Sequence, residues 1–109
     1  MDYETIQLGK KRMVATITLN RPKRLNALNV LCDELTDAIN QCKWDKGIRS
    51  VVLTGVGKAF CSGGDVNMIR DFLKDYPHDD PGKIIKEIVT PINQVVLGIQ
   101  ELKKPVSEQ

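Results

Sequence analysis

The sequence predicts an α/β fold, and three patterns support the prediction. Two short runs near the N-terminus alternate between apolar and polar residues, which is the period of a half-buried strand. A third run, at 50–54, is almost unbroken and rich in valine, as in a strand that is covered on both faces. Elsewhere, apolar residues recur at helical spacing. The expected order β-β-α-β-α-α corresponds to an α/β sandwich-like unit with a twisted sheet.

The first two strands are expected to form a β-hairpin. Residues 3–8 alternate, Gly9-Lys10-Lys11 reads as the turn, and residues 14–19 alternate again. Asn20-Arg21-Pro22 ends the second strand, because proline cannot continue a ladder of backbone hydrogen bonds. The polar residues 23–26 are expected to be a loop.

A first helix is predicted over 30–46, with Asn29 as its N-cap and Gly47 near its end. Its apolar positions recur at helical spacing: Leu31, Leu35, Ala38, Ile39 and Cys42. The strand at 50–54 follows it and runs into a glycine-rich loop at 55–65. That loop holds four of the eight glycines of the chain, and so much backbone freedom serves either a tight turn or a ligand.

Two further helices complete the predicted unit. The first covers 66–76, and the segment 77–82, with two prolines and a glycine, is expected to be a linker or mobile loop. The second covers about 83–102, is apolar over more than half of its circumference, and carries Pro91 as an expected kink.

Length and composition limit the chain to one globular unit. The 109 residues are enough for one domain, expected at 1–109. With 41% hydrophobic residues and a net charge of +2, a disordered tail is excluded. No window approaches the roughly 18 apolar residues of a membrane span, so a soluble protein without a membrane partner is expected. The first residues resemble neither a secretory signal nor a transit peptide, so a cytoplasmic location is the default.

The glycine-rich loop is the most informative segment for function. Exposed backbone N–H groups beside a helix N-terminus suit an anion or a developing oxyanion. Known phosphate motifs do not fit: Lys58 is followed by Ala59 instead of Ser or Thr, and Phe60 stands where G-x-G-x-x-G needs glycine. From the residues alone, a structural turn and a ligand site remain equally open.

The cysteines and the single histidine are weak candidates for chemistry. Cys32, Cys42 and Cys61 form an odd set without C-x-x-C, which favours reduced thiols over disulfides or zinc. A nucleophilic Cys61 lacks an obvious base, because the only histidine, His78, lies in a polar stretch. His78-Asp79-Asp80 could hold a metal, but a solvated loop is the favoured reading.

The basic residues are spread in pairs without interleaved aromatic residues, so nucleic acid is a poor fit as a partner. Arg21, Lys23 and Arg24 are three cations within four residues on a predicted loop. They form either a solvated turn or a contact to a phosphate-bearing ligand.

Two motifs together resemble a known family. Residues 18–28 read TLNRPKRLNAL, and residues 51–55 lead into the segment 58–65, KAFCSGGD. In order, spacing and content they strongly resemble the N-terminal part of the enoyl-CoA hydratase/isomerase (crotonase) superfamily. The resemblance covers essentially the whole chain.

The resemblance implies a crotonase-like spiral of ββα units that binds an acyl-CoA thioester and stabilises its enolate with two backbone N–H groups. It makes Gly64 the first donor. The positions that it places along the substrate are Lys23, Arg24, Ala27, Gly63, Asp65, Val66, Asn67 and Met68, with Met68 and Phe72 toward the acyl pocket. It implies no metal and no cofactor apart from the coenzyme A of the substrate, and a homo-oligomer, trimeric or hexameric in the full-length family.

The resemblance also implies that only the N-terminal part is present. In the family, the segment 102–106 leads into a buried strand and a glycine-rich turn with the second donor, whereas this chain finishes Ser107-Glu108-Gln109. The usual catalytic carboxylates would lie beyond that point, so a truncated product or isoform is expected. The chain would supply half of an oxyanion hole and no general base.

Three functional hypotheses follow. The first is part of an acyl-CoA hydratase or isomerase, and the second is a non-catalytic protein of the same ancestry that acts by binding or by oligomerising. The third, a nucleotide-binding α/β domain, lacks its phosphate motif.

Self-association of the chain is also predicted. The third helix is apolar on many sides, and the strand at 50–54 is expected to lack its outer neighbour.

Overall fold

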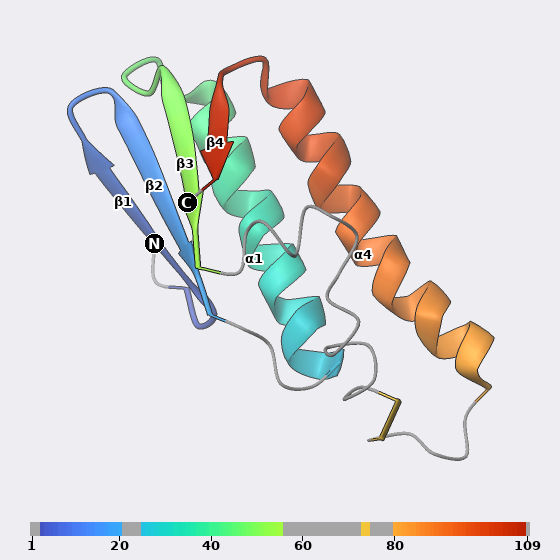
Figure 1. The fold of residues 1–109 in the computed structure, drawn as a ribbon. Helices are drawn as coiled ribbons and strands as arrows, with labels where there is room; N and C mark the ends of the chain where they lie inside the picture. Colours follow the sequence, from blue (N-terminus) through green and yellow to red (C-terminus); the bar gives the residue numbers. More distant parts are fainter. Residues whose placement is uncertain (1–2, 21–24, 56–72, 75–79, 109) are drawn as a thin grey trace.

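The computed structural model describes residues 3–20, 25–55, 73–74 and 80–108. Six elements follow one another: β1 (Ile6–Lys11), β2 (Val14–Leu19), α1 (Leu25–Trp44), β3 (Ser50–Thr54), α4 (Pro81–Leu102) and β4 (Val106–Glu108). The strands form one mixed sheet in the order β1-β2-β3-β4. Figure 1 shows α1 against the sheet and α4 running beside α1, and α1 contacts β1, β2 and α4. The α/β class and the helix-on-sheet arrangement are as predicted.

The hairpin forms, but its predicted turn is wrong. Gly9, Lys10 and Lys11 lie inside β1, where they pair with Thr16, Ala15 and Val14. The turn is formed instead by Arg12 and Met13, and Arg12 has a φ of 58°. A two-residue loop with positive φ matches the right-handed twist of the two strands, so the hairpin extends to that point. Gly9 was not a turn signal, because it adopts an ordinary strand conformation that other residues could also adopt.

Helix α1 begins earlier than predicted. It starts at Leu25, so Leu25 and Asn26 are not part of a loop, and Asn29 lies within the helix instead of capping it. The reason is the apolar stripe, which begins at Leu28, three residues before Leu31. Both side chains are fully buried.

Strand β3 has the predicted bounds, but its surroundings differ. It pairs with β2 and with β4, in both cases in parallel, with Thr18 opposite Thr54 and Val51 opposite Val106. The expectation that this strand lacks an outer neighbour is therefore wrong, and β4 forms the edge instead. Its expected burial on both faces is also wrong, because Val51 and Leu53 are buried while the alternating residues are half-buried.

Helix α4 takes up part of the predicted linker. Asp80 caps its N-terminus by accepting a hydrogen bond from the backbone N–H of Gly82 at 3.1 Å, and Pro81 is the first helical residue. The helix continues through Pro91. The predicted helix at 66–76 lies outside the described residues apart from the helical pair Leu73 and Lys74.

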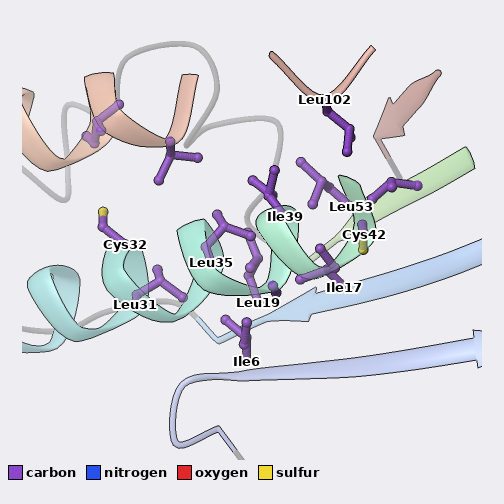
Figure 2. Close-up of a cluster of buried hydrophobic side chains, with 14 of the residues drawn as sticks. Ile6, Ile17, Leu19, Leu31, Cys32, Leu35, Ile39, Cys42, Leu53 and Leu102 are labelled. Atoms are coloured by element: carbon purple, nitrogen blue, oxygen red, sulfur yellow. The ribbon is translucent and has the colours of Figure 1, made fainter. Parts of the chain in front are cut away.

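The described core is entirely apolar. Figure 2 shows Leu35 and Ile39 of α1 in one cluster with Leu19 and Ile17 of β2, and all four are buried. Within the described ranges no polar or charged side chain is buried. Nor is any helix there long and apolar enough to cross a membrane. This framework is a scaffold, so functional groups belong to its edges and loops.

Candidate functional site

Both sequence motifs leave the sheet at the carboxyl ends of β2 and β3, and this end of the sheet is here called the carboxyl edge. The two strands are parallel and their last paired residues are Thr18 and Thr54. β4 also runs parallel to β3, with Glu108 opposite Leu53. In open sheets, ligands bind in the crevice outside the carboxyl ends of parallel strands. We therefore locate the candidate site at this edge.

Gly55 allows the two motif-bearing segments to approach each other closely. It is the first residue after β3 and has a φ of +95°, a conformation that side chains rarely adopt. A Cβ atom built at this position would lie 2.3 Å from the carbonyl oxygen of Leu19, the last residue of β2. The start of the glycine-rich segment is therefore in direct backbone contact with the start of the segment after β2.

The site residues implied by the resemblance lie outside the described residues. These are Lys23, Arg24, Gly63, Gly64, Asp65, Val66, Asn67 and Met68. The backbone of Ala27 is described within α1, but its side chain is not. The other candidates, Arg21, Cys61, Phe72 and His78, also lie outside. The role of Gly64 as a donor thus stays a prediction, supported by where its segment leaves the sheet.

The two described cysteines are buried, free thiols. Burial, together with the nearby Asp33, raises the pKa of Cys32 to about 12. Burial also raises the pKa of Cys42, although the ammonium group of Lys104 opposes the rise. A thiol that stays protonated is a poor nucleophile, so neither cysteine is a catalytic candidate. The expectation of reduced thiols is confirmed for these two.

The described residues offer no metal centre either. They contain no cluster of three or more histidine, cysteine, aspartate or glutamate side chains that could hold an ion. From the candidate triad at 78–80, only Asp80 is described, and its carboxylate caps α4.

A polar latch fastens the N-terminal segment to α1. The carboxylate of Glu34 accepts hydrogen bonds from the backbone N–H groups of Glu4 (2.8 Å) and Thr5 (2.7 Å) and from the Thr5 hydroxyl (2.6 Å). Desolvation alone would raise the pKa of Glu34, but these hydrogen bonds outweigh it and lower the pKa below its usual 4.5. No sequence signal could have shown this latch, because its partners lie about thirty residues apart.

A second part of the latch involves Tyr3. Its hydroxyl donates to Asp37 at 2.6 Å and accepts from the amide of Gln41 at 2.8 Å. Burial and the hydrogen bond to Asp37 raise the pKa of Tyr3, so the phenol keeps its proton. The latch is structural and sets how β1 meets α1.

Replacing Glu34 by glutamine is expected to lower the free energy of unfolding at pH 7 by about 1 kcal/mol, because charge-assisted hydrogen bonds are lost. The lowered pKa means that the native chain loses this contribution as the pH falls below 4.5. Urea unfolding at pH 7 and pH 4 would show a smaller pH dependence in Glu34→Gln. Glu87→Gln on the exposed side of α4 is the control and should match the native chain. Equal pH dependence in all three proteins would contradict the latch.

Lys104, two residues before β4, contacts the end of α1. Its ammonium group donates to the backbone carbonyl oxygens of Cys42 and, at 3.0 Å, of Asp45. These carbonyls lie at the C-terminal end of the helix, where the helix dipole attracts a cation. Sequence reasoning missed this contact.

The chain is similar to proteins of known family. A family model described as "Enoyl-CoA hydratase/isomerase" matches residues 9–97. The 1,2-epoxyphenylacetyl-CoA isomerase of Escherichia coli is 37% identical over 94 residues, which cover 85% of this chain and 34% of that protein. The mitochondrial enoyl-CoA hydratase of Pongo abelii is 36% identical over 104 residues, covering 83% of this chain and 34% of that protein.

A solved structure supports the same relation. The crystal structure of an enoyl-CoA hydratase/carnithine racemase from Magnetospirillum magneticum superposes with a TM-score of 0.64 and 27% identity, covering 98% of this chain and 39% of that one. The fold is thus the crotonase fold. The chain spans about a third of the length of the two curated relatives, 34% in each case.

Proposed function

Since the chain belongs to the enoyl-CoA hydratase/isomerase family, we propose that it forms part of an acyl-CoA site in which a thioester enolate is stabilised. One observation on this chain's own residues supports the proposal. The contact between Gly55 and the carbonyl oxygen of Leu19 brings the two motif-bearing segments to one edge of the sheet. A ligand at that edge can touch both segments at once.

The backbone N–H of Gly64 is the proposed oxyanion donor. In the enolate, negative charge develops on the thioester oxygen, and a fixed N–H donor in a site that excludes water stabilises this charge more than bulk water does. Glycine at 63 and 64 leaves room for the ligand to approach the backbone. The residues that follow, Asp65 to Met68, would lie along the substrate.

Lys23 and Arg24 are the proposed phosphate contacts, with Ala27 on the same side of the ligand. Both cations follow the end of β2 by only four and five residues, so their segment starts from the end of the sheet where the glycine-rich segment also begins. Guanidinium and ammonium groups are the usual protein partners of phosphate oxygens. No metal and no cofactor other than the coenzyme A moiety is part of the proposal.

Calorimetric titration with coenzyme A tests these assignments. The double variant Lys23→Ala/Arg24→Ala is expected to lose about tenfold in affinity, and native binding should weaken as salt is raised from low ionic strength. The matched control is Lys83→Ala/Lys86→Ala, which removes two exposed cations from α4. Equal losses in both pairs would mean that only overall charge matters, and unchanged affinity without Lys23 and Arg24 would overturn the phosphate assignment.

A non-catalytic role is the second candidate: binding of acyl-CoA, or assembly with a longer relative. The chain spans 34% of each of the two curated relatives, and neither of these roles would require a complete active site. Assembly of identical copies, as in the full-length family, remains part of the proposal. The two candidates differ in whether the chain turns over substrate.

A further inference from the structure

Three chain connections meet at the edge of the sheet opposite the candidate site. They are the hairpin tip 10–13, which includes the last two residues of β1, the loop 45–49 after α1, and the loop 103–105 after α4, and together they are here called the basic end. The carbonyl oxygen of Met13 accepts from the backbone N–H of Arg49 at 2.8 Å, and the N–H of Val51 donates to Pro105 at 3.0 Å. Figure 1 shows the three connections together at the upper end of the molecule.

The basic end concentrates positive charge. Seven of the sixteen basic residues lie in it: Lys10, Lys11, Arg12, Lys46, Arg49, Lys103 and Lys104. Of the fourteen acidic residues it holds one, Asp45. Because the whole chain carries only +2, the remainder is net negative. The separation of charge follows the fold and cannot be seen in the sequence, where the three segments that carry these cations are far apart.

Two of the seven cations have partners within the scaffold. Lys10 pairs with Asp45 at 3.3 Å, and Lys104 caps α1. The five others are exposed and make no ion pair with an acidic side chain in the part of the chain that the structure describes: Lys11, Arg12, Lys46, Arg49 and Lys103. Like charges held close together repel one another, so an anionic partner would relieve this cost.

Two large apolar side chains project at the same end. Met13 at the hairpin tip is 50% exposed, and Trp44 at the last position of α1 is 71% exposed. Trp44 lines a groove of about 610 Å³ together with Lys10 and Ile48. The ammonium group of Lys43 lies 5.3 Å from the centre of the indole ring. Exposed tryptophan and methionine amid lysine and arginine are typical of proteins that lie on a lipid surface.

We propose that the basic end docks on an anionic lipid surface. The cations contact lipid phosphates, while Met13 and Trp44 enter the boundary between headgroups and acyl chains. A nucleic acid could stack a base only on the indole face that Lys43 leaves open, so this partner is the weaker fit. This association needs no membrane-spanning segment. It would turn the carboxyl ends of β2 and β3, with the proposed acyl-CoA site, away from the lipid.

Trp44 is the only tryptophan of the chain, so its fluorescence reports directly on the basic end. Vesicles of phosphatidylcholine with about a third phosphatidylglycerol are expected to shift its emission to the blue and to sediment with the protein. Pure phosphatidylcholine vesicles should do neither, and raised salt should release the protein. Absence of a blue shift with the anionic vesicles would overturn the proposal, and so would equal binding to neutral ones.

Charge reversal locates the contact. Lys46→Glu/Arg49→Glu is expected to lower the partition onto anionic vesicles about tenfold or more, because each cation near the surface contributes separately. Lys83→Glu/Lys86→Glu applies the same change in charge to α4 and should bind like the native chain. Circular dichroism checks that both pairs fold. Equal losses would overturn the assignment, as would a single-stranded oligonucleotide that binds where the anionic vesicles do not.

Discussion

The 109-residue chain by itself is expected to leave crotonyl-CoA unhydrated. By the resemblance to the family, these 109 residues would supply one backbone donor, from Gly64, but neither the second donor nor the catalytic carboxylates. Loss of one oxyanion donor costs about 3 kcal/mol in the transition state, and loss of a general acid or base costs roughly 10² to 10⁴ in rate. The two losses together bring turnover close to the uncatalysed rate. The decrease in absorbance of the enoyl thioester measures it.

The enoyl-CoA hydratase of Pongo abelii, 36% identical to this chain, provides the positive control under the same conditions. Coenzyme A binding without hydration would support a partial site or a binding role. Hydration well above background would show that a residue within these 109 positions acts as the base. Asp65→Asn and His78→Gln would then identify it, and the division of the active site proposed above would be abandoned.

Replacing Gly55 by alanine is expected to damage stability and ligand binding together. The backbone at Gly55 has a φ of +95°, and the added Cβ would lie 2.3 Å from the Leu19 carbonyl oxygen, which is closer than real side chains come. Relief requires the ends of β2 and β3 to separate. We expect the free energy of unfolding to fall by about 2–3 kcal/mol and the affinity for coenzyme A to fall about tenfold, because the ends of β2 and β3 no longer lie in contact.

Gly9→Ala is the matched control, since a Cβ at Gly9 would meet nothing within 4 Å. It should change neither quantity appreciably. Urea unfolding and calorimetric titration, carried out where both variants are folded, separate the two effects. If Gly55→Ala lowers stability but keeps native affinity, the contact serves only the fold. The proposed site at the carboxyl ends of β2 and β3 then loses its main support.

Local sequence patterns correctly predicted the elements whose formation depends mainly on their own residues. Strand 50–54 has its predicted bounds because its run of valine and leucine favours a strand, although only Val51 and Leu53 are buried. The turn at Arg12 was missed because its positive φ is imposed by strand pairing and not by a turn-forming residue. Strand β4 was missed because three residues carry too little periodicity, and it exists only through its pairing with β3.

The residues of the candidate site can be predicted from the sequence, but their place in the fold cannot. The motif that includes Gly64 could be read from the sequence, whereas the contact of Gly55 with Leu19 is a property of the folded backbone. The basic end shows the same limit, since Arg12, Arg49 and Lys103 converge only when β1, β3 and α4 assemble. The Glu34 latch likewise depends on partners far away in the sequence. Pairings over long separations leave no local signature.

The contact between Lys104 and the end of α1 is expected to form late in folding. It joins residues 62 positions apart, from Lys104 to Cys42, and closing so long a loop is unfavourable until α1, β3 and α4 are in place. We therefore expect β4 to dock late and to complete two structures at once, the last turn of α1 and the outer edge of the sheet. Opening one exposes the other, so the two behave as a single cooperative unit at the basic end.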